Sequence, residues 1–127
     1  MNDQLTEQVI GAAFTVHNTL GFGFLESVYE KALSIELGKA EIAHTTRAPI
    51  RVNYEGHLVG EFFADILVED LVLELKSVTN LATVHEVQLV NYLTATGIDV
   101  GLLINFGPTK VEVRRKFRTY RGKEKTG

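Results

Sequence analysis

The spacing of apolar residues predicts that the chain begins with two helices. Apolar residues recur at helical intervals over residues 3–20, and Gly21 follows as a stop signal. A second helix is expected at about residues 25–37, with Gly38 beyond its end. The connection between them, residues 21–24, is short and contains two glycines and two phenylalanines.

The middle of the chain changes to a period of two, which indicates strands. Apolar and polar residues alternate over residues 50–54, so this strand is expected to have one solvated face, and residues 55–56 look like a turn. Residues 62–68 and 71–76 are more strongly apolar, and residues 69–70 form a polar turn between them. We expect these to be central strands covered on both faces.

The last third of the chain predicts one helix and two strands. Helical spacing returns over residues 82–96 and ends at Gly97. A buried strand is expected at residues 98–106, and alternation from Val111 suggests an edge strand that runs into a basic tail. The predicted order is ααβββαββ, which is a single α/β (α+β) unit.

Length and composition limit the class of protein. At 127 residues and 45% hydrophobic content, we expect one domain over residues 1–120 and a basic C-terminal tail at 121–127. The absence of cysteine excludes disulfides, thiolate catalysis, zinc–cysteine sites and iron–sulfur clusters. No apolar run approaches the roughly 20 residues that span a bilayer, and the polar N-terminus is unlike a signal peptide. We therefore expect a soluble cytoplasmic protein that does not bind membranes.

Charge is distributed unevenly along the chain. The formal net charge is −3, but residues 110–127 carry +6 and the first 109 residues carry −9. A basic end can bind a polyanion, and a solvated tail explains it equally well. The candidates for nucleic-acid contacts are Arg114, Arg115, Lys116 and Arg118. Their alternative role is to protect an edge strand from aggregation.

Three charged residues lie within the apolar strands, namely Asp65, Glu74 and Lys76. Buried charges cost several kcal/mol each unless they are paired or bind an ion. Glu74 and Lys76 are two residues apart on a strand, so they face the same side. If the turn is centred on residues 69–70, Asp65 lies opposite Glu74, where two carboxylates repel unless a cation lies between them. A two- or four-residue loop keeps this register, and a three-residue loop breaks it.

Two carboxylates and a lysine at one strand end suit the hydrolysis of a phosphodiester. Hard oxygen ligands hold Mg²⁺ or Mn²⁺, which polarises the phosphate and activates a water. The ammonium group of Lys76 can orient that water or stabilise developing charge. The alternative is a structural ion pair of Lys76 with Glu74 or Asp65 at the strand margin.

Three sequence motifs together resemble a known superfamily. Asp65 with Glu74-Leu75-Lys76 resembles the Asp…Glu-x-Lys core of the PD-(D/E)XK nucleases. The segment from Gly23 to Tyr29 resembles the motif that names the small GxxExxY family, and Gln88 to Tyr92 resembles the Gln-x-x-x-Tyr motif of exonuclease-like members. The resemblance covers roughly residues 3–120. It implies a restriction-endonuclease-like core, in which helices flank a mixed central sheet.

The resemblance also implies roles for individual residues. The catalytic set would be Asp65, Glu74, Lys76, Gln88, Tyr92 and Glu26. The ligands of Mg²⁺ or Mn²⁺ would be the side chains of Asp65 and Glu74 and the backbone carbonyl of Leu75. Glu26 would either complete this ligand set or support the ligands from behind. Gln88 would point toward a phosphate or water, and Tyr92 toward a ligand oxygen. For Glu26 the alternative is an acid favoured at a helix N-terminus, and Tyr29 is also explained as a core residue.

Two hypotheses of function follow. The first is a metal-dependent nuclease that hydrolyses phosphodiester bonds in DNA or RNA, with DNA the favoured partner. The second is a non-catalytic nucleic-acid-binding or protein-assembly module that retains the nuclease fold, which the acidic body favours because it repels a duplex. A domain of this size covers little of a nucleic acid, so a homodimer is also compatible with the sequence.

Overall fold

The computed structural model describes residues 3–119 and has the order of elements that the sequence predicts. The helices and strands are α1 (Asp3–Leu20), α2 (Glu26–Lys39), β1 (Thr45–Tyr54), β2 (His57–Val68), β3 (Leu71–Lys76), α3 (Thr83–Thr96), β4 (Val100–Phe106) and β5 (Val111–Phe117). The predicted basic tail at 121–127 lies outside the described residues. No helix in the described part of the chain is long and apolar enough to cross a membrane.

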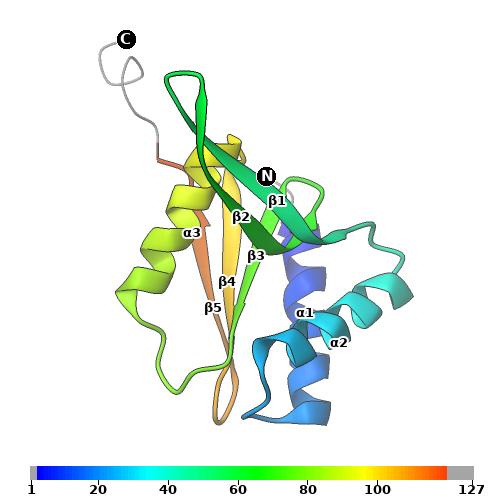
Figure 1. The fold of residues 1–127 in the computed structure, drawn as a ribbon. Helices are drawn as coiled ribbons and strands as arrows, with labels where there is room; N and C mark the ends of the chain where they lie inside the picture. Colours follow the sequence, from blue (N-terminus) through cyan, green and yellow to red (C-terminus); the bar gives the residue numbers. More distant parts are fainter. Residues whose placement is uncertain (1–2, 120–127) are drawn as a thin grey trace.

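The five strands form one mixed sheet in the order β1-β2-β3-β4-β5. Neighbouring strands are antiparallel except β3 and β4, which are parallel and are connected through α3. Helices α1 and α2 cover one face of the sheet and α3 covers the other (Figure 1). All seven residues of β4 are buried, because β4 lies in the sheet between β3 and β5 and is covered on both faces.

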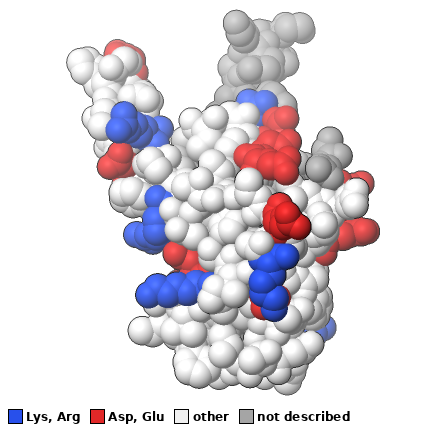
Figure 2. All heavy atoms as spheres, turned by 90° about the vertical axis from the view of Figure 1, so that its right-hand side faces the viewer, with Lys and Arg blue, Asp and Glu red and all other residues white. Residues whose placement is uncertain are grey.

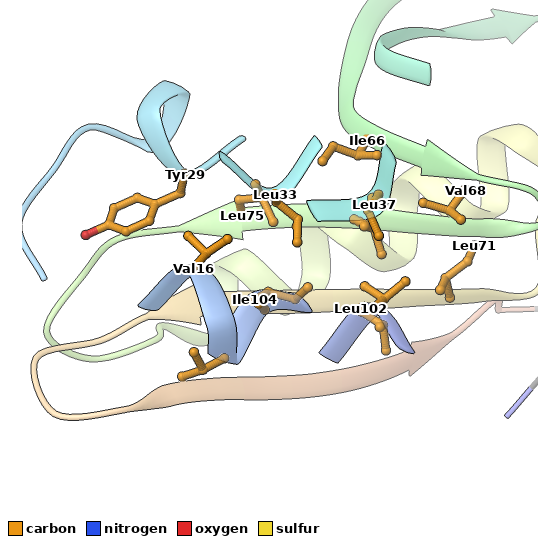
Figure 3. Close-up of a cluster of buried hydrophobic side chains, with 14 of the residues drawn as sticks. Val16, Tyr29, Leu33, Leu37, Ile66, Val68, Leu71, Leu75, Leu102 and Ile104 are labelled. Carbon is orange, nitrogen blue, oxygen red and sulfur yellow. The ribbon is translucent and has the colours of Figure 1, made fainter. Parts of the chain in front are cut away.

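The larger core lies between the sheet and the first two helices (Figure 3). In α2, Tyr29, Leu33 and Leu37 are four residues apart, so all three point to the same face, and all are fully buried. They pack on residues of β2, β3 and β4 such as Ile66 and Leu102. The predicted amphipathic helices therefore account for one complete layer of the fold.

Helix α2 runs two residues beyond its predicted end, so Gly38 lies inside the helix and is not its stop. The left-handed conformation that usually ends a helix is adopted instead by Glu41, with φ of 58°. The backbone N–H of Ile42 then donates to the carbonyl of Leu37 at 2.9 Å, which satisfies one of the last helical acceptors.

The turn between β2 and β3 has the register that brings Asp65 toward Glu74. Two residues, Glu69 and Asp70, connect the strands, and the ladder pairs Val68 with Leu71 and Ile66 with Leu73. Glu69 has a φ of 51°, which a two-residue hairpin turn requires and which a glutamate rarely adopts. The conditional prediction of the register is thus confirmed.

The β1–β2 hairpin bends at Asp65. Ala64 packs in the core between the sheet and α3, whereas Ile66 packs in the core between the sheet and helices α1 and α2. On a regular strand, residues two apart would share one face. On the neighbouring strand β1, Arg47 has a φ of 56°. Thr46 pairs with Ile66 and Ala48 with Ala64, but Arg47 between them has no paired residue on β2. Beyond the bend, the hairpin extends past the rest of the sheet above α3 (Figure 1).

This bend overturns one sequence prediction. We expected residues 62–68 to be covered on both faces, but Phe62 and Phe63 are 42% and 43% exposed. Both lie on the outer part of the hairpin, which α1 and α2 do not cover. The expectation holds for β3 and for the end of β2 from Ala64 to Val68.

Candidate active site

Asp65 and Glu74 come together where β2 separates from β3. The paired residues end at Ile66 and Leu73, and the next backbone N–H, that of Leu75, donates to Oδ2 of Asp65 at 2.8 Å. A side-chain carboxylate therefore replaces a backbone carbonyl as the acceptor for β3. The same bond fixes one oxygen of Asp65 beside Glu74.

The environment of Glu74 strongly disfavours its charged form. Burial, followed by repulsion from Asp65 and a hydrogen bond with that carboxyl, raises the pKa of Glu74 to about 9, and Lys76 offsets the shift only in part. Its Oε1 is buried and has no hydrogen-bond partner among the described residues. An unsatisfied buried carboxylate oxygen is costly, so this position calls for a proton or a cation.

Lys76 follows Glu74 on the same side of β3 and is half-buried. In residues 3–119 its ammonium group makes no salt bridge with Glu74 or with Asp65. The structural ion pair that was the alternative explanation for these residues is therefore not formed.

Helix α3 brings Gln88 and Tyr92 to one cavity of about 830 Å³. Burial, together with the negative charges of Glu74 and Asp65, raises the pKa of Tyr92, so its hydroxyl is near both carboxylates. Gln88 lies one helical turn earlier and is exposed. The two residues of the predicted motif thus share one surface, and Tyr92 links that surface to the carboxylates.

Glu26 does not join the carboxylate pair. It lies exposed in the first turn of α2, as the helix-terminus alternative predicts. One turn further on, Glu30 is the acid of α2 that Asp65 influences: burial and then repulsion by Asp65 raise its pKa, and Arg47 and Lys31 oppose this. No three His, Asp or Glu side chains in residues 3–119 form a group that could hold a metal ion.

The glycine–tyrosine motif around Glu26 has a clear structural role. Tyr29 is fully buried and stacks on Phe106 with 4.4 Å between ring centroids. Its hydroxyl donates to the carbonyl of Gly21 at 2.5 Å, and Gly23 has a φ of 113° that favours glycine. The motif therefore anchors the connection between α1 and α2, which confirms Tyr29 as a core residue.

Asn105 is a structural residue of the site that sequence reasoning missed. It is 1% exposed and pairs across the sheet with Lys76. Its side chain accepts from the N–H of Val78 and donates to the carbonyl of Val78, both at 2.9 Å. These two bonds hold the segment that leaves β3. A lone asparagine in an apolar strand was the available signal.

The predicted nucleic-acid contacts lie at or just beyond β5, which is an edge strand as expected. Each of the four is paired with a carboxylate: Arg114 and Lys116 with Glu86 (2.7 and 3.0 Å), Arg115 with Asp3 (3.5 Å) and Arg118 with Asp99 (2.7 Å). Cations and carboxylates also alternate on the α1/α2 face (Figure 2). Binding of nucleic acid by these residues stays a prediction.

Comparison with known proteins identifies the family. The model of the PD-(D/E)XK nuclease superfamily matches residues 3–116. The chain belongs to this superfamily. A crystal structure of SSO0001 shares the fold with a TM-score of 0.60 at 19% identity, over 98% of this chain and 61% of that chain. The chain thus spans about three fifths of the length of that structure. Among curated proteins, none matches.

PD-(D/E)XK nucleases are generally dependent on a divalent metal ion, and Asp65 and Glu74 are the two side chains that would hold one here, although no third acidic or histidine side chain joins them among residues 3–119. The observation that decides the fit is the partnerless Oε1 of Glu74 beside the carboxylate of Asp65. A divalent cation bound there would take the place of the proton that the raised pKa of Glu74 otherwise retains. Two carboxylates and a nearby backbone carbonyl are hard oxygen donors suited to Mg²⁺ or Mn²⁺.

Proposed function

We propose that this protein is a metal-dependent nuclease that hydrolyses phosphodiester bonds in DNA or RNA. The observation that carries the proposal is the half-buried carboxylate pair of Asp65 and Glu74, in which one buried oxygen of Glu74 has no hydrogen-bond partner among residues 3–119. Keeping two carboxylates together at this cost has no structural benefit, because a neutral side chain would fill the same space without repulsion.

The residues of this site have separable roles. Asp65 and Glu74, with the backbone carbonyl of Leu75, would hold Mg²⁺ or Mn²⁺. When bound, the ion supplies Lewis-acid activation of the phosphate and lowers the pKa of a bound water. Lys76 carries a charge that no salt bridge neutralises in the described part of the chain, so it is available to a phosphate oxygen or to the attacking water. Gln88 and Tyr92 lie on the α3 side, where they can orient the phosphate.

Membership of the GxxExxY family is part of the same proposal. The segment from Gly23 to Tyr29 supports it, since the motif has a defined structural role in the connection before α2. Glu26 is then an acid in the first turn of α2, and Glu30 is the acid of α2 whose pKa Asp65 raises.

A second candidate is a binding or assembly module without catalytic activity. The ion pairs of β5 favour it, because Glu86 neutralises Arg114 and Lys116, which would otherwise attract a phosphate backbone. A dimer of such modules would also present a larger binding surface. The availability of Lys76 argues for the nuclease, since a binding module has no use for an unpaired lysine beside two carboxylates.

Calorimetric titration of Mn²⁺ and Mg²⁺ tests the proposal directly. The wild type and the double variant Asp65→Ala, Glu74→Ala are titrated, and the same samples are incubated with single- and double-stranded DNA and RNA. We expect metal binding and cleavage in the wild type and neither in the variant. Metal binding without cleavage of any substrate would favour the binding module, and no metal binding would overturn the catalytic assignment.

A further inference from the structure

A cavity of about 830 Å³ separates α3 from the outer part of the β1–β2 hairpin. This volume falls within the roughly 300–1,000 Å³ of typical small-ligand sites. The cavity exists because the hairpin bends at Asp65 and passes over α3 instead of continuing the sheet (Figure 1). Its walls therefore come from α3 and from the β1–β2 hairpin, whose strand β2 carries Asp65.

The lining of this cavity differs in charge from most of the chain. Its polar side chains are three amides, one cation and two hydroxyls: Asn53, Gln88, Asn91, Arg51, Tyr92 and Thr94. No carboxylate lines it among the residues that the structure describes, although the first 109 residues contain fourteen acids. Arg51 pairs with Glu61 at 3.2 Å, but both side chains are exposed, and such a pair is weak enough to exchange for a phosphate.

An aromatic ring forms part of the wall. Phe62 lines the cavity and contacts Tyr92 with 5.4 Å between ring centroids and an angle of 38°. Despite this contact, Phe62 is 42% exposed, so part of its ring is open to a further stacking partner. A half-exposed phenylalanine flanked by amide groups matches what a nucleobase needs, namely a face for stacking and donors and acceptors for its edge.

Tyr92 is the residue that the cavity and the carboxylate site share. This residue lines the cavity on one side and lies within electrostatic reach of Glu74 and Asp65 on the other. A strand whose base occupied the cavity would therefore have its backbone directed toward the carboxylates.

We propose that the cavity between α3 and the β1–β2 hairpin binds an unpaired nucleotide, so that the preferred ligand is a single-stranded polynucleotide. In a duplex, both faces of a base are stacked and its pairing edge is used, so neither Phe62 nor the amides could reach it. The inference rests on the proposed function only for the cleavage of the bound strand, because binding of the strand itself needs no metal.

Binding of a fluorescent oligothymidylate of about 12 nucleotides, measured by anisotropy in EDTA, tests the inference. We expect the wild type to bind it more tightly than the corresponding duplex. Phe62→Ala should weaken binding about tenfold or more, because stacking on an aromatic side chain is lost. The matched control is Phe63→Ala, which removes a neighbouring ring of similar exposure outside the cavity and should change binding less than about twofold.

Two further variants keep the test decisive if Phe62→Ala is unstable. Phe62→Leu retains an apolar contact with Tyr92 but removes the stacking face, and thermal unfolding verifies that it folds. Asn91→Asp introduces a carboxylate at an exposed helix position in the cavity wall and should weaken binding most strongly at low salt. An oligouridylate of the same length separates DNA from RNA.

The outcomes distinguish this inference from the proposed nuclease function. Equal binding of duplex and single strand, or wild-type binding by Phe62→Leu and Asn91→Asp, would overturn the inference even if the protein cleaved DNA. Tight single-strand binding that is lost in these variants would support it even if Mg²⁺ and Mn²⁺ produced no cleavage. In that case only the nuclease assignment would fail.

Discussion

Replacing Glu74 with glutamine should stabilise the metal-free protein and abolish metal binding. The glutamine has nearly the same shape and carries no charge, and its amide can donate to Asp65 as the protonated acid does. The substitution therefore removes repulsion and the cost of burying charge without leaving a cavity. A purely structural residue would behave in the opposite way, because removing one partner of a buried ion pair destabilises by about 3–5 kcal/mol.

The size of the effect depends on pH. The folded-state pKa of Glu74 is about 9 and its ordinary value is 4.5, so the folded protein holds a proton that the unfolded chain releases between these values. The wild type is therefore most stable below pH 4.5 and loses stability as pH rises toward 9. Each pKa unit corresponds to about 1.4 kcal/mol, which gives an upper limit of about 3 kcal/mol for the loss at pH 7.

Chemical and thermal unfolding of the wild type and Glu74→Gln in EDTA at pH 5, 7 and 8.5 measures this loss. The two proteins should be similar at pH 5, and the variant should be more stable at pH 7 by about 2–3 kcal/mol, or several degrees in Tm. Adding Mn²⁺ at about one hundred times its Kd should stabilise the wild type by about 2.7 kcal/mol and leave the variant unchanged. Glu7→Gln, an exposed carboxylate on α1, is the matched control and should change stability by less than about 0.5 kcal/mol.

One result would refute the reasoning. If Glu74→Gln lowered the free energy of unfolding by the same amount at pH 5 and pH 8.5, and Mn²⁺ had no effect on the wild type, the Glu74 carboxylate would be a structural partner. The repulsion argument and the metal site would then both be wrong.

Three further substitutions separate catalytic, structural and electrostatic roles. Lys76→Met should reduce cleavage about 100-fold or more in a steady-state assay while calorimetry still detects metal binding, and loss of the binding heat would place Lys76 in a structural role. Asn105→Ala should cost about 2–4 kcal/mol in urea denaturation, because it leaves the part-buried N–H and carbonyl of Val78 without their side-chain partner; a cost below about 1 kcal/mol would mean that water replaces it. Glu86→Gln should release Lys116, while Arg114 keeps its ion pair with Glu112, and should steepen the salt dependence of polynucleotide binding by about one charge; an unchanged slope would exclude Lys116 from the interface.

The sequence predicts the fold well because the hydrophobic periods are unambiguous. The α2 face of Tyr29, Leu33 and Leu37 and the continuous apolar run of β4 leave few alternatives to helices packed on a sheet. The boundary of α2 was less predictable. A glycine is a common helix stop, but Gly38 is passed over because Glu41 takes the left-handed position three residues later.

The carboxylate pair could be predicted only on a condition, because it depends on whether the turn between β2 and β3 has an even or an odd number of residues. Glu69 and Asp70 are poor hairpin residues, and a loop with one more residue would have placed Asp65 on the wrong face. The spacing of residues could not predict that Glu30, rather than Glu26, is the acid of α2 whose pKa is raised by Asp65. Glu26 and Glu30 lie on one side of α2, and which of them Asp65 influences depends on how the helix packs against the bend in β2.

That bend connects the chemistry of the site with its proposed ligand. Asp65 lies where the face of β2 changes, opposite Arg47 at a φ of 56°. A non-glycine residue in this conformation costs on the order of 1 kcal/mol and persists only where the surrounding structure enforces it. The bond from the Leu75 N–H to Asp65 lies at this bend, and Phe62 lies in the cavity wall three residues before it. One irregularity in β2 therefore positions both the carboxylate pair and the aromatic wall of the cavity.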